Sequence, residues 1–122
     1  MKILVTLLVA AVAATGSLKA TLKGSGHTPK INVHWPYVVR VTIDGKPAPA
    51  RITAQIVDPI GGKHPVQFGT STKNITNYKI KGVFRDFIIW PGSARGVPLK
   101  LRITVVTTAG RKVLSYSVVP HA

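Results

Sequence analysis

The chain contains no cysteine and no glutamate, and only three of its 122 residues are acidic. Without cysteine it can form no disulfide, thiolate metal site or lipidated N-terminal cysteine. Asp44 and Asp58 lie in the stretches IDGK and VDPIGG, where aspartate commonly bonds to its own turn backbone. Asp86 is then a lone candidate general acid, and one carboxylate supports little acid–base chemistry. We expect Asp86 to be partly buried and bound to an arginine or a backbone amide.

Residue patterns typical of other catalytic and metal sites are also missing. The stretch PGSARG places a glycine directly before Ser93, so it does not match the G-x-S-x-G nucleophile elbow. No glycine-rich loop leads into a helix, as a phosphate-binding loop requires. We therefore predict a protein that is not an enzyme and that holds no cofactor and no metal. The histidines are not spaced like the ligands of a compact metal site. They are His27, His34, His64 and His121. His64 in GGKHP is the best single ligand candidate.

A long apolar run occurs only at the N-terminus, in MKILVTLLVAAVAATGSLKA. Lys2 precedes the apolar stretch from Ile3 to Ala14, and small residues follow it, as in a secretory signal peptide. As a helix this stretch would rise only about 18 Å, less than the roughly 30 Å of a hydrocarbon core. We predict a signal peptide over residues 1–20, with an uncleaved N-terminal anchor as the alternative. A flexible linker is predicted over 21–29 and one domain over 30–122.

From Lys30 onward, apolar and polar residues alternate with the period of a β-strand. The runs YVVRVTI, ARITAQIV and VFRDFIIW show this pattern, and Gly and Pro interrupt the chain between them. Shorter runs lie at 66–68 and at about 73–80. The pattern predicts about seven or eight short strands. The expected fold is all-β, with two antiparallel sheets packed face to face and a signal helix before them.

The clearest local prediction is a hairpin near the C-terminus. Its strands are 99–107 and 112–119, and TAGR is the turn. Gly110 would supply the positive φ that tight hairpin loops need. The side chains expected to face the core are Leu99, Leu101, Ile103, Val105, Leu114, Tyr116 and Val118.

Two stretches resemble the immunoglobulin-like sandwiches of bacterial secreted and surface proteins: VRVTIDGKPAPARITAQIV and FIIWPGSARGVPLKLRITVVTTAGRKVLSYSV. The resemblance covers about residues 30–120 and rests on strands and turns. It implies an immunoglobulin-like β-sandwich that acts in adhesion, spacing or ligand presentation without catalysis. The cysteine pair and the core tryptophan between them, which are typical of antibody domains, are absent.

Charge is the remaining signal, because 17 basic residues give the chain a net charge of +14. Such a field attracts polyanions, although it also serves solubility. In an immunoglobulin-like sandwich, the strands starting at 50, 99 and 112 share a sheet. We therefore predict one basic ligand-binding face, and the alternative is that charged strand exteriors only discourage edge pairing and aggregation. The predicted face consists of Arg51, Lys100, Arg102 and Arg111.

The sequence thus predicts a secreted or cell-envelope binding or adhesion module. Its expected partners are anionic polymers, acidic proteins or an anionic membrane surface. Sequence-specific nucleic-acid binding is not expected, because stacking on bases needs exposed aromatics. Most of the aromatics lie in strand patterns that place them in the core: Trp35, Tyr37, Phe84, Phe87, Trp90 and Tyr116. The alternative function is a structural subunit that pairs through an exposed edge strand, either KINVHW (30–35) or residues 66–68.

Overall fold

The computed structural model describes residues 16–122. These residues contain nine β-strands, one 3-10 turn at Gly92–Ala94 and no α-helix. None of the described segments is a helix long and apolar enough to cross a membrane. The strands are β1 (Leu18–Gly24), β2 (His34–Ile43), β3 (Lys46–Pro47), β4 (Pro49–Val57), β5 (Lys63–Pro65), β6 (Tyr78–Lys81), β7 (Val83–Ile89), β8 (Leu99–Thr107) and β9 (Gly110–Val118).

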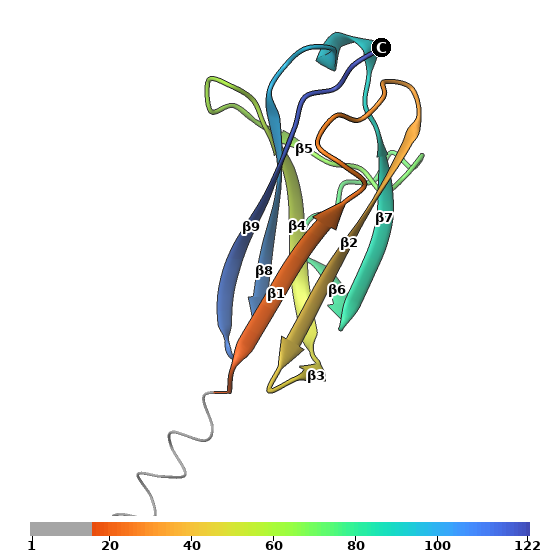
Figure 1. Cartoon of the computed structure of the whole chain (residues 1–122). Coiled ribbons are helices and arrows are strands. Elements are labelled where there is room, and N and C mark those ends of the chain that lie inside the picture. The colour runs from red at the N-terminus through yellow and green to blue at the C-terminus, as the bar shows by residue number, and fades with distance from the viewer. Residues whose placement is uncertain (1–15) are drawn as a thin grey trace, which may run out of the picture.

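The strands form two antiparallel sheets that face each other (Figure 1). Sheet I has the order β1-β2-β7, with the short β3 added to β2. Sheet II has the order β6-β4-β8-β9, with the short β5 added to β4. The sheets are joined through the β6–β7 hairpin, where Lys81 pairs with Val83. The predicted all-β fold of two antiparallel sheets is therefore confirmed.

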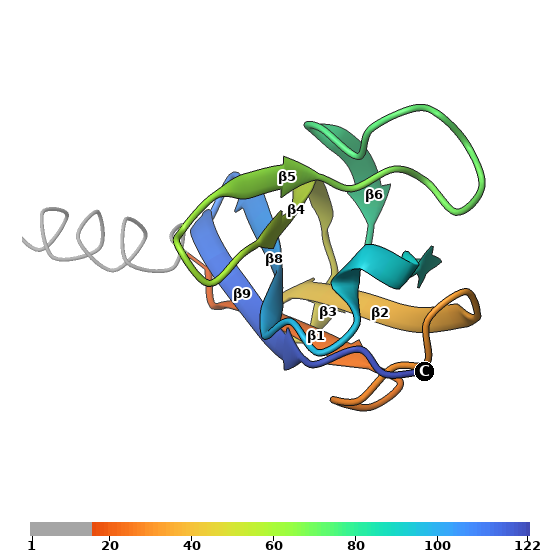
Figure 2. The ribbon, with the colours of Figure 1, turned by 90° about the horizontal axis from the view of Figure 1, so that it is seen from above.

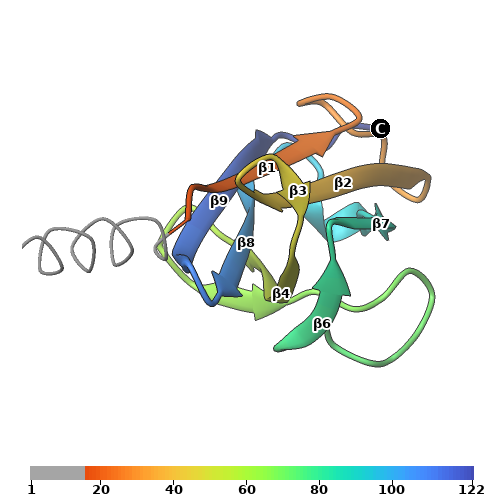
Figure 3. The same ribbon diagram turned by 90° about the horizontal axis from the view of Figure 1, so that it is seen from below.

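The two long sides of the sandwich differ. On one side, β1 of sheet I lies beside β9 of sheet II (Figures 1 and 2). On the opposite side, β5 and β7 do not pair, and the β5–β6 loop swings outward there (Figures 2 and 3). At one end, the C-terminal segment is tied to the β1–β2 loop, since Val119 donates to the carbonyl of His27 at 2.8 Å. The sheets are therefore close together along the β1–β9 side, and on the opposite side they separate between β5 and β7, beyond the β6–β7 hairpin.

Strict alternation places one face of each long strand in the core. On β2, Trp35, Tyr37, Val39 and Val41 are buried, while the residues between them face outward or are half-buried. Burying such a side chain stabilises the fold by about 1.5–3 kcal/mol. The predicted inward row of the last hairpin is confirmed. Leu101, Ile103, Val105 and Val118 are buried, and Leu99, Leu114 and Tyr116 pack against the core.

Two tight turns follow from residues that accept a positive φ. Asp44 and Gly45 have φ values of 53° and 79°, which is the type I′ geometry that matches the twist of a hairpin. They connect β2 to β3, and the Asp44 carboxylate accepts a hydrogen bond from the Ser17 amide at 2.9 Å. Gly110, at φ 136°, supplies the predicted positive φ next to the β8–β9 turn.

The first strand lies where the sequence predicted a linker. β1 spans Leu18–Gly24 and pairs with β2 along its whole length, so the flexible-linker assignment is wrong for residues 21–24. The folded domain begins by Leu18 instead of residue 30. Leu18, Ala20 and Leu22 face inward here, a period-two pattern that the polar stretch after Leu22 obscured. Residues 1–15 of the predicted signal peptide lie outside the described part of the chain.

Neither segment expected to be a free edge strand is one. Within KINVHW, His34 and Trp35 belong to β2, which pairs on both sides with β1 and β7. Val66 is buried, its amide donates to Ala54 and its carbonyl accepts from Ile75. The backbone groups of His34, Trp35 and Val66 are therefore already bonded within the chain.

Candidate functional site

The four predicted basic residues lie on the outer face of sheet II. Directly opposed residues of an antiparallel pair point to the same face, and Val106 of β8 opposes both Arg51 of β4 and Arg111 of β9. Lys100 and Arg102 have the same orientation as Val106, because alternate residues of a strand share a face. The strands starting at 49, 99 and 110 share a sheet, as the resemblance implied.

Two further lysines extend this surface. Lys79 of β6 opposes Arg51, and Lys63 of β5 opposes Val57, which in turn opposes Lys100. The sequence did not place these lysines, because β5 and β6 are too short to show alternation. We call the complete set the first cationic face: Arg51, Lys63, Lys79, Lys100, Arg102 and Arg111.

The first cationic face has two groups of charges. Arg51, Lys79 and Arg111 lie in one cross-strand row with Val106. Lys63, Lys100 and Arg102 lie toward the other end of the sheet, because Arg102 precedes Val106 by about 13 Å of extended strand. A row of uncharged residues separates the groups, namely Thr53, Thr104 and Val113. A ligand that contacts both groups must therefore be elongated.

No carboxylate neutralises these cations. Within residues 16–122, the only ion pair joins His64 to Asp58. Arg51 Nη1 donates to the carbonyl oxygen of Asn77 at 3.0 Å, which fixes the guanidinium but leaves its charge unpaired. Arg102 is half-buried, and its Nε has no protein partner in the described part of the chain. The face therefore presents donors and uncompensated positive charge.

The three acids form no ion pair with this face, since two lie in turns or loops and the third lies inside the sandwich. Asp58 Oδ1 accepts hydrogen bonds from the amides of Ile60 and Gly62 in the β4–β5 loop. Asp86 faces the inside of the sandwich, and its Oδ2 accepts from the Gly69 amide at 3.1 Å. The prediction that Asp86 is partly buried and bonds an arginine or a backbone amide is confirmed, and the partner is the amide. The carboxylates thus shape loops and leave the outer sheet faces without negative charge.

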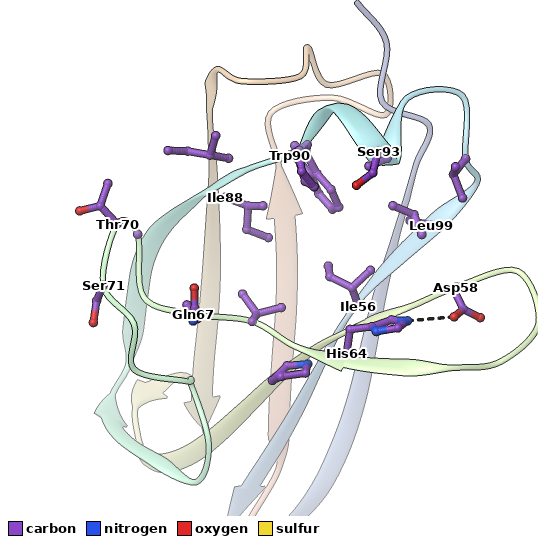
Figure 4. A pocket seen from close by; sticks show the side chains of 17 residues that line it. Ile56, Asp58, His64, Gln67, Thr70, Ser71, Ile88, Trp90, Ser93 and Leu99 are labelled. Carbon is purple, nitrogen blue, oxygen red and sulfur yellow. Dashed lines mark hydrogen bonds and ion pairs between the residues drawn. The ribbon is translucent and has the colours of Figure 1, made fainter.

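A pocket of about 750 Å³ lies on the β5–β7 side of the sandwich, between the two sheets (Figure 4). Its walls are the segment from His64 to Ser71 and the segment from Ile88 to Leu99. Most lining side chains are apolar, with the Asp58–His64 pair at one rim (Figure 4). The sequence did not indicate this pocket, because segments from both sheets build it. Its apolar lining includes Ile56, Val66, Ile88, Trp90, Val97 and Leu99.

The Asp58–His64 pair organises a loop and does not complete a catalytic triad. His64 Nε2 lies 2.9 Å from Asp58 Oδ2, and this contact, followed by the Gly62 amide, lowers the pKa of Asp58. Ser93 lines the same pocket, but Ile56 and Leu99 lie between it and His64 (Figure 4). Acyl transfer by a serine requires a direct contact with its base, and the described residues show none here.

The aromatic side chains lie mostly where the sequence predicted them. Trp35, Tyr37 and Trp90 are buried, and Phe84 packs against the core. Phe87 is the exception, because it opposes Pro36 on the outer face of sheet I and stacks on His34 at 3.9 Å between ring centroids. Phe87 is therefore the member of the predicted set that does not belong to the core. The His34 ring covers one face of the Phe87 ring.

The histidines do not converge on a metal site. No group of three or more His, Cys, Asp or Glu side chains that could hold a metal occurs between residues 16 and 122. His27 stacks on Tyr116 with 4.3 Å between ring centroids, and its Nδ1 lies 2.6 Å from the Ser117 carbonyl oxygen. Its role in the structure is to pack the β1–β2 loop against β9.

Comparison with known proteins finds similarity in fold. No protein-family model matches the chain, and no curated protein matches it. The human F-spondin reeler domain has a similar structure, with a TM-score of 0.56 at 10% sequence identity over 87% of this chain and 91% of that domain. A DUF4466 family protein from Parabacteroides merdae aligns with a TM-score of 0.46 and 15% identity, over 84% of this chain and 43% of that protein. The first similarity shows a shared β-rich fold and carries no function with it.

Proposed function

We propose that this protein is a non-catalytic binding module that attaches to linear anionic polymers through the first cationic face. The observation that carries the proposal is that six basic side chains share one sheet face with no acidic residue among them. In the described chain none of the six is paired with a carboxylate. Like charges gathered without counter-charges repel one another, and a bound polyanion relieves that repulsion.

An elongated polymer matches the layout better than a compact ligand. The two groups of cations lie about 13 Å apart along β8, with uncharged side chains between them. Because the Debye length is about 8 Å at physiological ionic strength, the groups act nearly independently on small anions. A chain of phosphate or carboxylate groups can contact both groups at once and gain from each contact.

We further propose that the sandwich is of the immunoglobulin-like type found in secreted proteins. The adjacency of β4, β8 and β9 in one sheet supports this. Secretion or envelope localisation through the N-terminal segment belongs to the same proposal. Leu18 and Ala20 pack against the core, which supports cleavage before Leu18, among the small residues from Ala13 to Ser17. Mass spectrometry of the secreted chain tests this, and cleavage after Ala20 contradicts it.

The experiment that tests binding is salt-stepped elution from immobilised inorganic polyphosphate and from immobilised polygalacturonate, which separate phosphate from carboxylate recognition. The wild-type protein is expected to bind at low salt and to elute at moderate salt, because counterion release dominates such binding. The triple variant Arg51→Glu, Lys100→Glu, Arg102→Glu is expected to elute much earlier.

A matched control separates the face from the net charge. Lys30→Glu, Lys46→Glu and Lys73→Glu change the charge by the same amount at exposed positions off the first cationic face. This control is expected to elute close to wild type. Equal losses in the two triple variants, or no binding by wild type to either polymer, contradict the proposed function. Because Arg102 is half-buried, the corresponding Gln variants are measured in parallel, with thermal unfolding to show that each folds.

A further inference from the structure

The outer face of sheet I carries a second group of basic residues that the sequence did not reveal. Lys19 and Lys23 of β1, Arg40 of β2 and Arg85 of β7 all point outward and are exposed. We call these four residues the second cationic face. Two of the four lie on β1, in residues that the sequence assigned to a signal peptide and a linker. Only the pairing of β1 with β2 brings them beside Arg40.

The register makes this group compact, with Arg40 at its centre. Arg40 opposes Thr21 of β1 on one side and Val83 of β7 on the other. Lys19 and Lys23 are therefore both diagonal neighbours of Arg40, and Arg85 is its diagonal neighbour across β7. Diagonal neighbours in a sheet lie about 7–8 Å apart. One guanidinium thus has three other cations as diagonal neighbours, whereas each group of the first cationic face holds three cations in all.

The second cationic face is also without counter-charge. None of its four residues is in an ion pair within the described chain, and all three acids lie in turns, in loops or inside the sandwich. Such a cluster is unfavourable by itself, because the other three charges lie within about one Debye length of Arg40. An anionic chain laid across β1, β2 and β7 relieves the repulsion, as on the first face.

The two faces point in opposite directions, because sheets I and II pack with their inner faces together (Figure 2). The protein core, roughly 10 Å between the sheets, separates them. A short anionic chain bound to one face cannot reach the other. Two chains can therefore bind one protein molecule, one on each side.

We propose that each molecule has two independent polyanion sites on opposite faces, and that one monomer cross-links two anionic polymer chains. This inference rests on the proposed function and extends it from attachment to cross-linking. It differs from dimer-mediated bridging, because a single copy suffices. Cross-linking then requires both faces, whereas attachment requires only one.

The test uses three variants of the full chain with equal charge change. The first-face variant is Arg51→Gln, Lys100→Gln, Arg102→Gln, and the control is Lys30→Gln, Lys46→Gln, Lys73→Gln. The second-face variant is Lys23→Gln, Arg40→Gln and Arg85→Gln. Binding stoichiometry is measured with short fluorescent inorganic polyphosphate, together with sedimentation of the complex to give its protein copy number. Cross-linking is measured as the turbidity of long-chain polyphosphate.

Wild type and control are expected to bind two short chains per monomer and to make long-chain polyphosphate turbid. Each face variant is expected to bind one short chain and to lose most of the turbidity. Wild type that binds one short chain per monomer overturns the inference and leaves the proposed function standing. Undiminished turbidity in either face variant, or short-chain complexes that contain two protein copies, also overturns it. No binding by wild type overturns the proposed function itself, and the inference with it.

Discussion

Arg51 on β4 and Arg111 on β9 flank the same β8 residue, Val106, in one cross-strand row. Val106 is half exposed, at 47%, between the two guanidinium groups. This arrangement makes Val106 a position where a single substitution can neutralise part of the first cationic face.

Val106→Glu is expected to place a carboxylate between Arg51 and Arg111 and to weaken binding to polyphosphate. Because opposite charges directly across a sheet stabilise it by about 0.2–1 kcal/mol per pair, the variant should unfold at the same temperature as wild type or slightly higher. Val33→Glu is the control, since Val33 is also 47% exposed but lies in the β1–β2 loop. A larger loss of affinity in the control contradicts the assignment of the face.

Gly24→Ala is expected to destabilise the protein by about 1–3 kcal/mol, the usual cost of overpacking. A methyl group at Gly24 would overlap the ring of Trp35, and it would come within 2.9 Å of Tyr116. Gly92→Ala is the control, because the closest atom to its added methyl is 4.0 Å away. Thermal unfolding of both variants measures the difference. Equal melting temperatures would mean that the end of β1 does not pack on Trp35.

Tyr37→Phe is expected to leave the fold unchanged and to stabilise it by about 1 kcal/mol. The Tyr37 hydroxyl is buried and has no protein partner in the described chain, and an unsatisfied buried hydroxyl is costly. Tyr78→Phe is the control, since Tyr78 is 44% exposed. Chemical denaturation gives both free energies. A loss of stability in Tyr37→Phe would show that the hydroxyl has a stabilising partner.

The same burial, with a smaller contribution from the Asp86 carboxylate, raises the pKa of Tyr37 well above its usual value. A raised folded-state pKa contributes stability that is present below the unfolded value, about pH 10, and is lost as the pH rises further. In an ultraviolet titration, wild type is expected to show one tyrosine that ionises only as the protein unfolds. The Tyr37→Phe variant should lack the tyrosine ionisation that accompanies unfolding. If that ionisation persists in the variant, it belongs to another tyrosine.

Asp58→Asn is expected to lower the melting temperature at neutral pH, with a difference from wild type that shrinks in acid. The hydrogen bond from His64, followed by that from the Gly62 amide, lowers the pKa of Asp58. A lowered folded-state pKa contributes stability above the unfolded value, about 3.9 for aspartate, and this is lost as the pH falls through the folded value. Melting curves at several pH values between neutral and about pH 2 test the sign.

His64→Gln provides the second arm of this experiment. Removing the imidazole takes away the largest cause of the shift, so the pKa of Asp58 should rise toward its usual value in a carboxyl NMR titration. An unchanged Asp58 titration would mean that the backbone amides alone hold the carboxylate. A melting-temperature difference between Asp58→Asn and wild type that grows in acid would contradict the sign of the linkage.

The sequence by itself determined the class of fold, because alternation and turn chemistry are local. Successive residues of a strand point to opposite faces, so Val39 and Val41 face inward and Arg40 faces outward. This prediction needs no contact with distant residues. The Asp44–Gly45 turn follows equally from residues that accept a positive φ. Even the outward direction of Phe87 was implicit, since it has the opposite parity to Phe84 and Asp86 on one uninterrupted strand.

Tertiary structure decided which strands lie side by side, because pairing joins residues far apart in the chain. In the sequence, Lys19 and Lys23 are isolated lysines in or near the predicted signal peptide. The pairing of β1 with β2 places them around Arg40. The pocket between the sheets likewise needs the segment from His64 to Ser71 and the segment from Ile88 to Leu99 together. Local periodicity gives the face of each residue within its strand. The register between strands determines which residues are neighbours across the sheet, and the packing of the whole core selects that register.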